Sequence, residues 1–386
     1  MKNDTNPLRV LFFTSAVEHR TFRKTVKMLS EVGIKAHYIG FTRYNYPCPN
    51  DGLETTILGK VQHRNYIKRF FLVFGQLPRV RRKAKKNDLV YCFSLDALIL
   101  ASLATVGTRI PIVYQVQDIR PILVGRKIKN RLSRLLEKLA LGRVKHVVLS
   151  SRAFYESHFQ VHYGLSEDWI SVIENKIEND PNPPVIPVKN ITSWHTSPIR
   201  IGYFGMLRCS RSWEILKSAV DSAEGRLELI VRGKPVGLKT FDTDVSSSNR
   251  IFYGGPYRSP DELDNLYQRV DLVWSAYPYG KGEQGNWQWA RTVRFYEAGA
   301  FGKPMISQAE TQDAYVISQY GIGLNIDMAD PQGVIERLLS ISHEELSEWS
   351  RNLLNTPRSL FIHTEEEYRE LKEKLNILVG GTNELA

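Results

Sequence analysis

The sequence predicts an α/β protein of two doubly wound domains in tandem. Short apolar runs alternate with helical patterns along the chain, an order typical of parallel sheets with right-handed crossovers. The alternation stops at residues 178–198, a segment rich in Pro and Asn, and then starts again. The chain of 386 residues is also too long for one ordinary core. We therefore expect an N-terminal domain at 1–180, a linker at 181–198, a second domain at 199–355 and a C-terminal helical segment at 356–386.

In the first domain the expected strands alternate with helices and with an apolar segment at 96–107. The strands are 8–15, 35–41, 88–94, 111–118, 146–150 and 170–175, and the helices are 21–33, 126–143 and 152–163. The basic helix 126–143 carries one apolar stripe at helical spacing, formed by Ile128, Leu132, Leu135, Leu136 and Leu139. Such a stripe favours a helix that packs its apolar face on the core and exposes its charged back.

In the second domain the same alternation recurs. The expected strands are 199–205, 227–233, 251–255, 271–277, 304–308 and 321–326, and the helices are 212–223, 260–269 and one within TVRFYEAGAFGKP, 292–304. A final helix at 364–378 could pack on either domain.

Composition excludes several classes of protein. With 42% hydrophobic and 24% charged residues, the chain is neither disordered nor fibrous. The three cysteines, Cys48, Cys92 and Cys209, have no paired spacing, so neither a disulfide framework nor a metal site is expected. The N-terminus lacks a signal-peptide layout and no apolar run is long enough to span a bilayer, so the expected location is the cytoplasm.

Positive charge is concentrated in the first domain. Residues 1–180 hold 30 Lys and Arg against 15 Asp and Glu, a balance of +15, which leaves −4 for residues 181–386 of a chain with a net charge of +11. One domain is therefore expected to face something anionic: nucleic acid, a phosphate-bearing substrate or an anionic membrane. The basic stretches 66–86 and 125–145 suit docking on anionic lipid, at about 1 kcal/mol per near-surface cation. No nucleic-acid-binding pattern accompanies them.

A basic loop opens the second domain. In IGYFGMLRCSRSWEIL a strand ends at Gly205, the loop carries Arg208 and Arg211, and a helix begins near Ser212. This order aims backbone N–H groups and two guanidinium groups at one point, which suits a diphosphate. The alternative is a pair of surface arginines beside a turn.

Three stretches of the second domain resemble the GT-B glycosyltransferases, specifically the large family 4-like group that builds bacterial surface polysaccharides. They are IGYFGMLR, YGGPYRSPDELDNLYQRVDLV and VRFYEAGAFGKPMIS, and VYQVQD and VIENKI match in the first domain. The resemblance covers most of residues 8–330. It implies two Rossmann-like domains that face each other across a cleft, with a nucleotide-sugar donor on the second domain and no metal or other cofactor.

The resemblance also implies roles for single residues. Glu297 takes the position of the Glu that binds the nucleotide ribose, and one carboxylate can accept hydrogen bonds from both ribose hydroxyls. The small residues 298–300 would let this helix approach the nucleotide. Arg211 takes the position of a phosphate-binding Lys, and Arg208 lies close to the family's Arg.

Three further residues are expected at the donor. Arg294, one turn before Glu297, would lie near the phosphates or the sugar, unless the two only form a salt bridge on a solvated face. Tyr257 and Arg232 are expected to line the base pocket.

The sequence departs from the family at one donor position. Many retaining members carry another Glu eight positions before the ribose Glu, where Trp289 stands here, and Glu283 could replace it only from a shifted loop. The sugar and the anomeric outcome stay open. The letters DTD at 242–244 match the Asp-x-Asp of metal-dependent transferases, but their setting predicts a solvated polar loop. Without a metal, Arg208, Arg211 and a helix N-terminus would neutralise the leaving group.

Acceptor residues are expected in the first domain. The strand in VYQVQD ends at Asp118, where the family often has His-Asp or His-Glu, and Asp118 is expected to act as a general base or to orient the acceptor hydroxyl. Gln117 stands where that pattern has His, and a helix cap or a structural hydrogen bond is the alternative role of Asp118. His19 or Arg20, in AVEHRTFRK, would contact an acceptor phosphate, and a purely structural His19 is the alternative.

The sequence thus predicts an enzyme, a glycosyltransferase that is peripheral on the cytoplasmic face of the cell membrane. It would move a sugar from a UDP- or GDP-sugar to a hydroxyl of a lipid-linked saccharide in envelope, capsule or exopolysaccharide biosynthesis. Its partners would be the donor, the lipid-linked acceptor and an anionic membrane surface, but no nucleic acid. Two alternatives stay open: a nucleotide-sugar epimerase of the same fold, and a non-catalytic nucleotide-sugar-binding subunit of a polysaccharide assembly complex.

Overall fold

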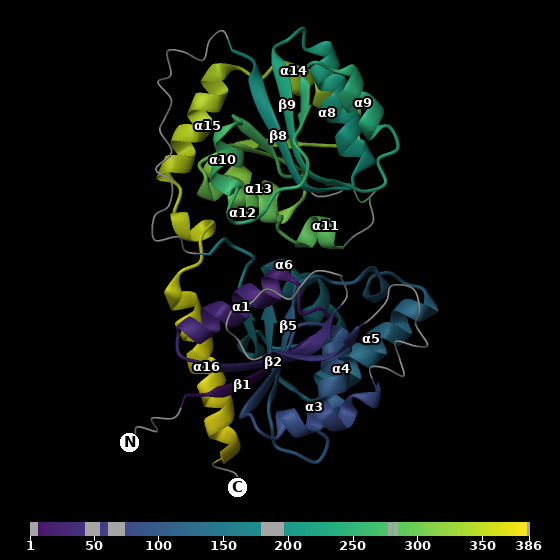
Figure 1. Cartoon of the computed structure of the whole chain (residues 1–386), viewed down its shortest axis with the longest axis vertical. Helices are drawn as coiled ribbons and strands as arrows, with labels where there is room; N and C mark the ends of the chain where they lie inside the picture. The colour runs from purple at the N-terminus through teal and green to yellow at the C-terminus, as the bar shows by residue number, and fades with distance from the viewer. Residues whose placement is uncertain are drawn as a thin grey trace. The chain divides into compact units, whose positions relative to one another are not determined.

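The computed structural model describes residues 7–42, 55–60, 74–178, 197–276, 280 and 285–383. The chain forms two compact units. Unit 1 comprises Met1–Glu174 and Thr364–Ala386, and unit 2 comprises Asn175–His363. In Figure 1 the strands of unit 1 are purple and blue, and those of unit 2 are teal and green. These limits differ from the expected ones: unit 2 extends beyond 199–355 at both ends, and the expected segment 356–386 is divided between the units.

Unit 1 is a doubly wound domain around one parallel sheet. Its described strands lie in the order β3-β2-β1-β4-β5-β6-β7. They are β1 (Arg9–Thr14), β2 (Lys35–Thr42), β3 (Thr55–Lys60), β4 (Leu89–Cys92), β5 (Ile112–Val116), β6 (Val144–Leu149) and β7 (Ile170–Val172). The order reverses between β1 and β4, where the connecting helices change from one face of the sheet to the other.

The helices of unit 1 include two that the sequence did not predict as such. They are α1 (Arg20–Glu31), α3 (Leu77–Ala84), α4 (Leu95–Ala104), α5 (Ile128–Leu141), α6 (Arg152–Phe154), α7 (Gln160–Tyr163) and α16 (Glu365–Asn383). Every strand predicted for the first domain is confirmed. Strand β3 and helix α3 were missed because each buries very few side chains, Leu58 in β3 and Val80 with Ala84 in α3.

Helix α16 packs on unit 1, although it follows unit 2 in the sequence. Tyr368, Leu371 and Leu375 belong to the same buried cluster as strand β1. The Lys372 ammonium donates to the carbonyl of Val32, just after α1, at 2.6 Å. Figure 1 shows α16 in yellow alongside α1. The chain therefore returns to its first unit to complete that unit's core.

Helix α5 has the opposite orientation to the one predicted. Ile128, Leu132, Leu135, Leu136 and Leu139 are exposed. The buried residues of α5 are Asn130, Glu137, Ala140 and Leu141. The prediction of a core-facing stripe is wrong because polar contacts, rather than apolar burial, hold the inner face of this helix.

Unit 2 is a second doubly wound domain. Its strands are all parallel and lie in the order β10-β9-β8-β11-β12-β13. They are β8 (Ile199–Leu207), β9 (Leu227–Pro235), β10 (Ile251–Tyr253), β11 (Leu272–Trp274), β12 (Met305–Gln308) and β13 (Gly323–Ile326), and each was predicted. Two separate buried clusters, one containing Trp274 and the other its neighbour Val273, pack on the sheet's two faces.

The helices of unit 2 cover both faces of its sheet. They are α8 (Ser210–Ser222), α9 (Phe241–Ser247), α10 (Leu263–Gln268), α11 (Asn286–Trp289), α12 (Val293–Ala300), α13 (Gln312–Tyr320), α14 (Pro331–Leu339) and α15 (His343–Asn355). The DTD segment lies in α9, so the predicted polar loop is wrong there. Asp244 accepts a hydrogen bond from Trp213 Nε1 at 2.7 Å, which attaches α9 to α8.

Two kinds of feature are absent from the described ranges. No helix in them is both long and apolar enough to cross a bilayer. No group of His, Cys, Asp and Glu side chains in them is arranged to hold a metal ion.

The packing of α16 can be tested by truncating its buried face. Leu375→Ala should lower the free energy of unfolding by about 3 kcal/mol, because Leu375 is 0% exposed in the core of unit 1. The matched control on the same helix is Ile377→Ala, whose side chain is 71% exposed. It should change stability by less than about 0.5 kcal/mol. Urea unfolding followed by circular dichroism measures both, and equal effects would contradict the packing described.

Candidate functional site

The first candidate site lies at the carboxyl edge of the unit 2 sheet. The strand order reverses between β8 and β11, so the chain leaves these neighbours toward opposite faces of the sheet. Ligands of doubly wound domains bind at this edge, beside such a reversal. Most residues predicted to bind the donor belong to the segments that follow these strands or to helix α12.

Glu297 is a buried carboxylate in helix α12. Its side chain is 2% exposed, and its Oε2 accepts a hydrogen bond from the Tyr267 hydroxyl at 2.9 Å. Burial, together with the charge of Glu297, raises the pKa of Tyr267 well above its ordinary value. The hydroxyl therefore stays protonated and donates to the carboxylate at all physiological pH values.

Arg294 joins the same helix to the ends of two strands. Its guanidinium donates to the carbonyl of Phe204 in β8 at 3.2 Å and to that of Ala276, after β11, at 2.9 Å. It also lies over the ring of Tyr203, 5.3 Å from the centroid. Arg294 thus bridges the strand reversal and fixes α12 against it, whereas the sequence predicted a contact with the donor phosphates or sugar.

The start of helix α12 is also fixed. Thr292 caps the helix by accepting from the N–H of Phe295 at 3.1 Å, and it donates its own hydroxyl to Asp313 at 2.9 Å. Asp313, in α13, is itself buried. The first turn of α12 is therefore fixed by contacts within the protein and needs no ligand for its position.

Two facing glycines lie where β8 and β9 end. Gly205 and Gly233 are register partners with positive φ angles, and a Cβ on Gly233 would lie 1.8 Å from the Gly205 carbonyl oxygen. A Cβ built on Gly205 would lie 3.8 Å from the hydroxyl of Tyr257. Tyr257 also contributes to raising the pKa of Tyr267, after burial and Glu297. Gly205, Tyr257, Tyr267 and Glu297 are thus neighbours.

Arg232 has a structural role at this edge. It donates to the carbonyls of Gly255 and Pro256 and pairs with Glu262 at 2.9 Å. These bonds hold the turn that carries Tyr257. Arg232 therefore stabilises the turn whose Tyr257 is predicted to line the base pocket.

Arg208 and Arg211 follow β8 at the same edge. Arg208 is exposed on the loop, and Arg211 is half-buried in the first turn of α8. Cys209 caps that helix, with its sulfur accepting from the N–H of Ser212 at 3.4 Å. Both arginines therefore lie next to the N-terminus of α8 in the chain, and the convergence of their guanidinium groups on a diphosphate stays a prediction.

The small residues after Glu297 serve packing. A Cβ on Gly299 would lie 2.1 Å from the ring of Phe361, and Ala298 and Ala300 are buried in the same cluster as that ring. The small size of these side chains is thus explained by packing against Phe361, and the expected approach of this run to a nucleotide stays a prediction. Trp289 is buried in α11, and Glu283 lies outside the described residues.

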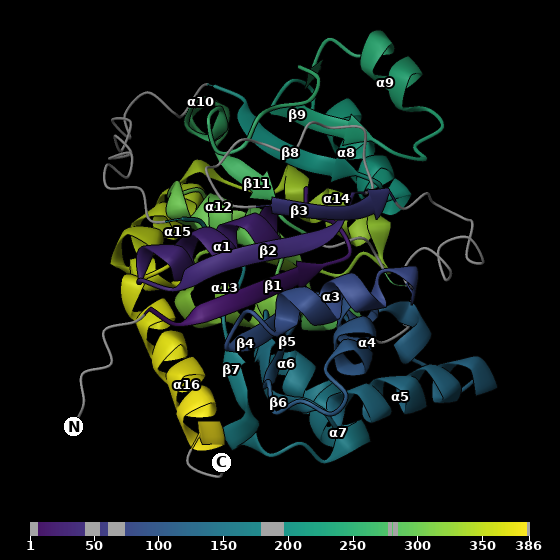
Figure 2. The same ribbon diagram turned by 60° about the horizontal axis from the view of Figure 1, so that its bottom comes forward.

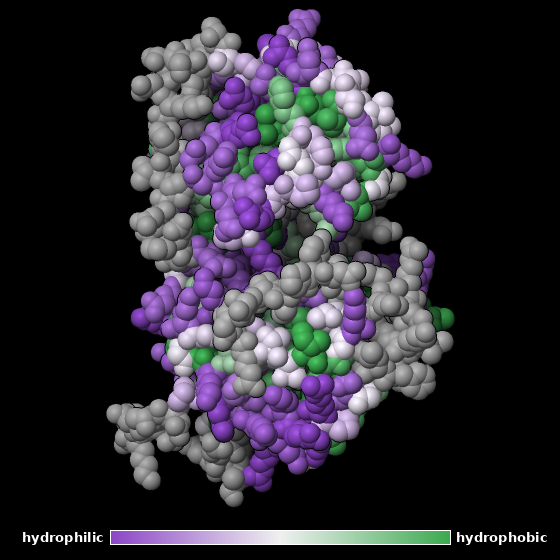
Figure 3. Space-filling model, in the orientation of Figure 1, coloured by the Kyte–Doolittle hydropathy of each residue, from purple (hydrophilic) through white to green (hydrophobic). Residues whose placement is uncertain are grey.

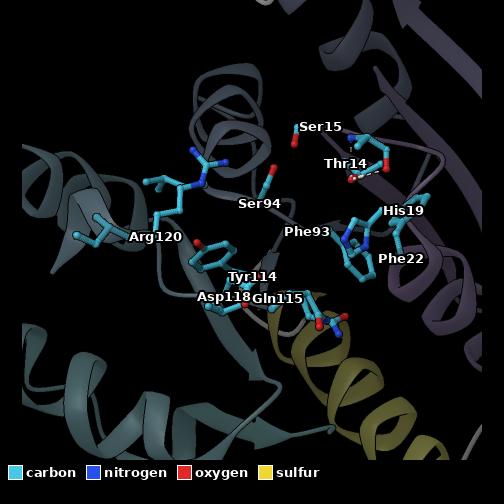
Figure 4. Close-up of a pocket in the computed structure, with 15 residues that line it drawn as sticks. Thr14, Ser15, His19, Phe22, Phe93, Ser94, Tyr114, Gln115, Asp118 and Arg120 are labelled. Atoms are coloured by element: carbon cyan, nitrogen blue, oxygen red, sulfur yellow. Dashed lines mark hydrogen bonds between the residues drawn. The ribbon is translucent and has the colours of Figure 1, made fainter. Parts of the chain in front are cut away.

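The second candidate site is a pocket within unit 1, at the carboxyl ends of β1, β4 and β5. Its volume is about 190 Å³. Asp118 and His19, both predicted, line it together with residues that the sequence reasoning missed, and Arg20 does not. The missed residues include Thr14, Ser94, Tyr114, Gln115 and Arg120. Figure 4 shows Ser94, Tyr114 and Asp118 between His19 and Arg120.

Asp118 follows β5 and is exposed. The short helix that comes next, Pro121–Leu123, is preceded by Arg120, so Asp118 does not cap it. Arg120 pairs with both oxygens of Asp96 at 3.2 Å. The positive charge of Arg120 at this strand end is thereby neutralised by a neighbouring carboxylate.

The pocket has unused hydrogen-bonding capacity. Gln115 is 1% exposed, and its amide oxygen has no hydrogen-bond partner among the described residues. The same holds for both amide atoms of Gln117, the residue that stands where the family pattern has His. Buried polar atoms normally have partners. The pocket therefore suits a ligand rich in hydroxyl groups.

Proteins that are similar to this chain in sequence or in structure bear on its fold and its function. No family model matches the chain. The succinoglycan biosynthesis protein ExoL of Rhizobium meliloti is 27% identical over 341 residues, which cover 85% of this chain and 83% of that protein. The structure of Anabaena HepE in complex with UDP has a TM-score of 0.70 and 15% identity, and the match covers 96% of this chain and 100% of that one. That of WaaG, a glycosyltransferase involved in lipopolysaccharide biosynthesis, has a TM-score of 0.62 and 17% identity, with 96% and 100% covered.

The predicted fold class is thereby confirmed: the chain has the GT-B fold, with two doubly wound units. The similar proteins also agree with the predicted enzyme class, a glycosyltransferase of this fold. The roles of single residues stay predictions.

The hydrogen bond to Glu297 can be tested by removing one oxygen atom. Tyr267→Phe should lower the free energy of unfolding by about 1–3 kcal/mol, because a buried carboxylate loses a donor. Tyr315→Phe is the control, since Tyr315 is 68% exposed, and it should leave stability unchanged. Thermal unfolding gives both values. If Tyr267→Phe leaves the free energy of unfolding unchanged, the bond does not stabilise the site.

Proposed function

We propose that the chain is a glycosyltransferase that transfers a sugar from a nucleotide-diphosphate sugar to a hydroxyl of a lipid-linked saccharide in bacterial polysaccharide biosynthesis. The observation that carries the proposal is Glu297, a buried carboxylate held beside Tyr257 and Tyr267 at the carboxyl edge of the unit 2 sheet. A fixed acceptor of hydrogen bonds at this edge suits the two hydroxyls of a ribose.

The donor diphosphate would bind where β8 leads into α8. The N-terminus of that helix and the side chains of Arg208 and Arg211 would stabilise the negative charge that develops on the leaving diphosphate. The reaction would then need no metal ion. The structurally similar HepE was crystallised in complex with UDP, and a uridine nucleotide is accordingly the first donor to test.

The acceptor would bind the pocket of unit 1. The amide groups of Gln115 and Gln117 would bond to saccharide hydroxyls, and Asp118 would orient the attacking hydroxyl or accept its proton. The name of ExoL places that relative in succinoglycan biosynthesis, which supports a saccharide as the acceptor. The cation surplus of residues 1–180 supports a peripheral location on the cytoplasmic face of an anionic membrane.

Glu297→Gln should weaken nucleotide binding about 10- to 100-fold, because a neutral amide loses the charge-assisted hydrogen bonds to the ribose. Glu336→Gln, a change of the same kind on the exposed side of α14, is the matched control and should bind normally. Titration calorimetry with UDP and GDP measures both. Equal affinities of the two variants would remove Glu297 from the donor site.

Asp118→Asn should keep nucleotide binding and lower turnover about 100-fold or more, because the attacking hydroxyl loses its base. The assay follows UDP released from UDP-sugars, alone and with a lipid extract as acceptor. The control is Asp168→Asn, an exposed carboxylate of unit 1 outside the pocket. An unchanged rate for Asp118→Asn would exclude it as the base.

Analysis of the donor sugar after incubation, together with the UDP-release assay and calorimetry, separates the two alternatives from the proposal. Interconversion of the donor sugar without release of UDP would identify an epimerase. Binding of the nucleotide without either reaction would identify a non-catalytic subunit.

A further inference from the structure

Helix α5 is built with its apolar side outward. The exposed fractions of Ile128, Leu132, Leu135, Leu136 and Leu139 run from 50% to 84%. Helix α8, by contrast, buries its apolar residues Ile215, Leu216, Ala219 and Val220 in the ordinary way. Figure 2 shows α5 at the outer edge of unit 1. Its solvent side is therefore the opposite of what a surface helix of a soluble domain normally presents.

The inner side of α5 is polar and hydrogen-bonded. Glu137 is 0% exposed and accepts hydrogen bonds from Tyr163 at 2.6 Å, His158 at 2.8 Å and Tyr114 at 3.4 Å. Asn130 donates to the carbonyls of Pro121, Ile122 and Val124. A carboxylate buried with these donors cannot turn outward without losing them. The outward position of the leucines is thus fixed by the opposite face.

The same contacts connect α5 to the acceptor pocket. Arg134 donates to the carbonyls of Leu123 and Gly125 at 2.8 and 2.9 Å, and Leu123 lines the pocket. Tyr114, whose hydroxyl reaches Glu137, lines it too. One helix therefore presents an apolar side to the surroundings and holds one wall of the pocket with its other side.

Cations flank the exposed leucines. Successive residues of a helix are turned by about 100°, which puts Lys129 on one flank of the apolar stripe and Arg131 with Lys138 on the other. All three are exposed. Between Arg126 and Lys145 the chain has eight Lys and Arg and one acidic residue, the buried Glu137. In Figure 3 a small hydrophobic area is visible at the outermost edge of unit 1, where Figure 1 places the end of α5.

We propose that the outer face of α5, formed by Ile128, Leu132, Leu135, Leu136 and Leu139 with Lys129, Arg131 and Lys138, docks into an anionic lipid bilayer. An apolar ridge flanked by cations on both sides matches the boundary between acyl chains and negatively charged headgroups. A second copy of this chain is the less suitable partner, because an α5–α5 contact would bring the two sets of cations together.

This docking would place the pocket of unit 1 beside the lipid that carries the acceptor, and in that respect the inference rests on the proposed function. The binding of vesicles does not depend on it. The two can therefore fail separately.

The test uses the full chain and vesicles of phosphatidylcholine, with or without phosphatidylglycerol, in a flotation assay at low and high salt. The wild-type protein should bind the anionic vesicles, and less so at high salt. Leu132→Ser/Leu139→Ser and Lys129→Glu/Lys138→Glu should each lower the vesicle partition coefficient by about tenfold or more.

Two matched controls separate docking by α5 from general stickiness. Val161→Ser/Leu354→Ser removes two side chains that are 67% and 62% exposed elsewhere. Arg369→Glu/Lys374→Glu makes the same change of net charge at exposed positions of α16, which lies outside both basic stretches and buries Leu371 and Leu375 in unit 1. Both should float as the wild type does. Thermal unfolding checks that every variant is folded, and UDP calorimetry reports the donor site independently.

Three results would overturn the proposal: no flotation of the wild type with anionic vesicles, no effect of the α5 changes, or equal losses in the controls. Light scattering tests the alternative of a dimer. If the wild type is a dimer, and Leu132→Ser/Leu139→Ser makes it a monomer without changing its flotation, the outer face of α5 is instead a self-interface. If the wild-type protein floats with anionic vesicles but does not bind UDP, the proposed function is refuted and the docking surface is not.

Discussion

The edge of unit 2 that we propose as the donor site is organised by one guanidinium group, that of Arg294. Where the strand order reverses, β8 and β11 send their chains to opposite faces of the sheet, and main-chain carbonyl groups of both segments lie within reach of one side chain. Arg294 bonds two of these carbonyls, those of Phe204 and Ala276, and so ties α12 to both strands. Glu297 follows one turn later and takes its position from this attachment. The carboxylate is thus fixed by main-chain bonding before any nucleotide arrives, which is the condition for binding without a large ordering cost.

Unit 1 repeats the strand order and uses it differently. Its reversal lies between β1 and β4, and the nearby cation, Arg120, pairs with the carboxylate of Asp96 instead of strand carbonyls. The strand ends are left to line a pocket, where amide atoms of Gln115 and Gln117 have no partner among the described residues. One topology therefore gives an edge with several arginines in unit 2 and, in unit 1, a pocket lined by amide groups, by Asp118 and by an arginine that pairs with Asp96. This difference is what the proposed charged donor and the proposed hydroxyl-bearing acceptor would require.

Most strands of the two units could be predicted because buried strands appear in the sequence as short runs of apolar residues. Strand β3, which buries only Leu58, was missed. Glu297 and the loop of Arg208 could be singled out because charged residues interrupt such runs. Tyr267 could not, since an aromatic residue at helical spacing reads as core, and its hydroxyl bond joins residues thirty positions apart. Arg294 and Arg232 could be singled out, but their hydrogen bonds to main-chain carbonyls could not be predicted, because a sequence does not reveal which carbonyls lie within reach of a side chain.

Helix α5 shows a deeper limit. Its period was read correctly and its direction was not, because a 3.6-residue pattern defines two faces but does not say which one is inside. The direction was decided by three donors, Tyr114, His158 and Tyr163, which converge on Glu137 from other elements of unit 1. A lone acid among eight cations was the one visible sign that this face had a partner. Because the partner is internal, the leucines are left outside, and the wall of the pocket and the apolar surface become opposite sides of a single helix.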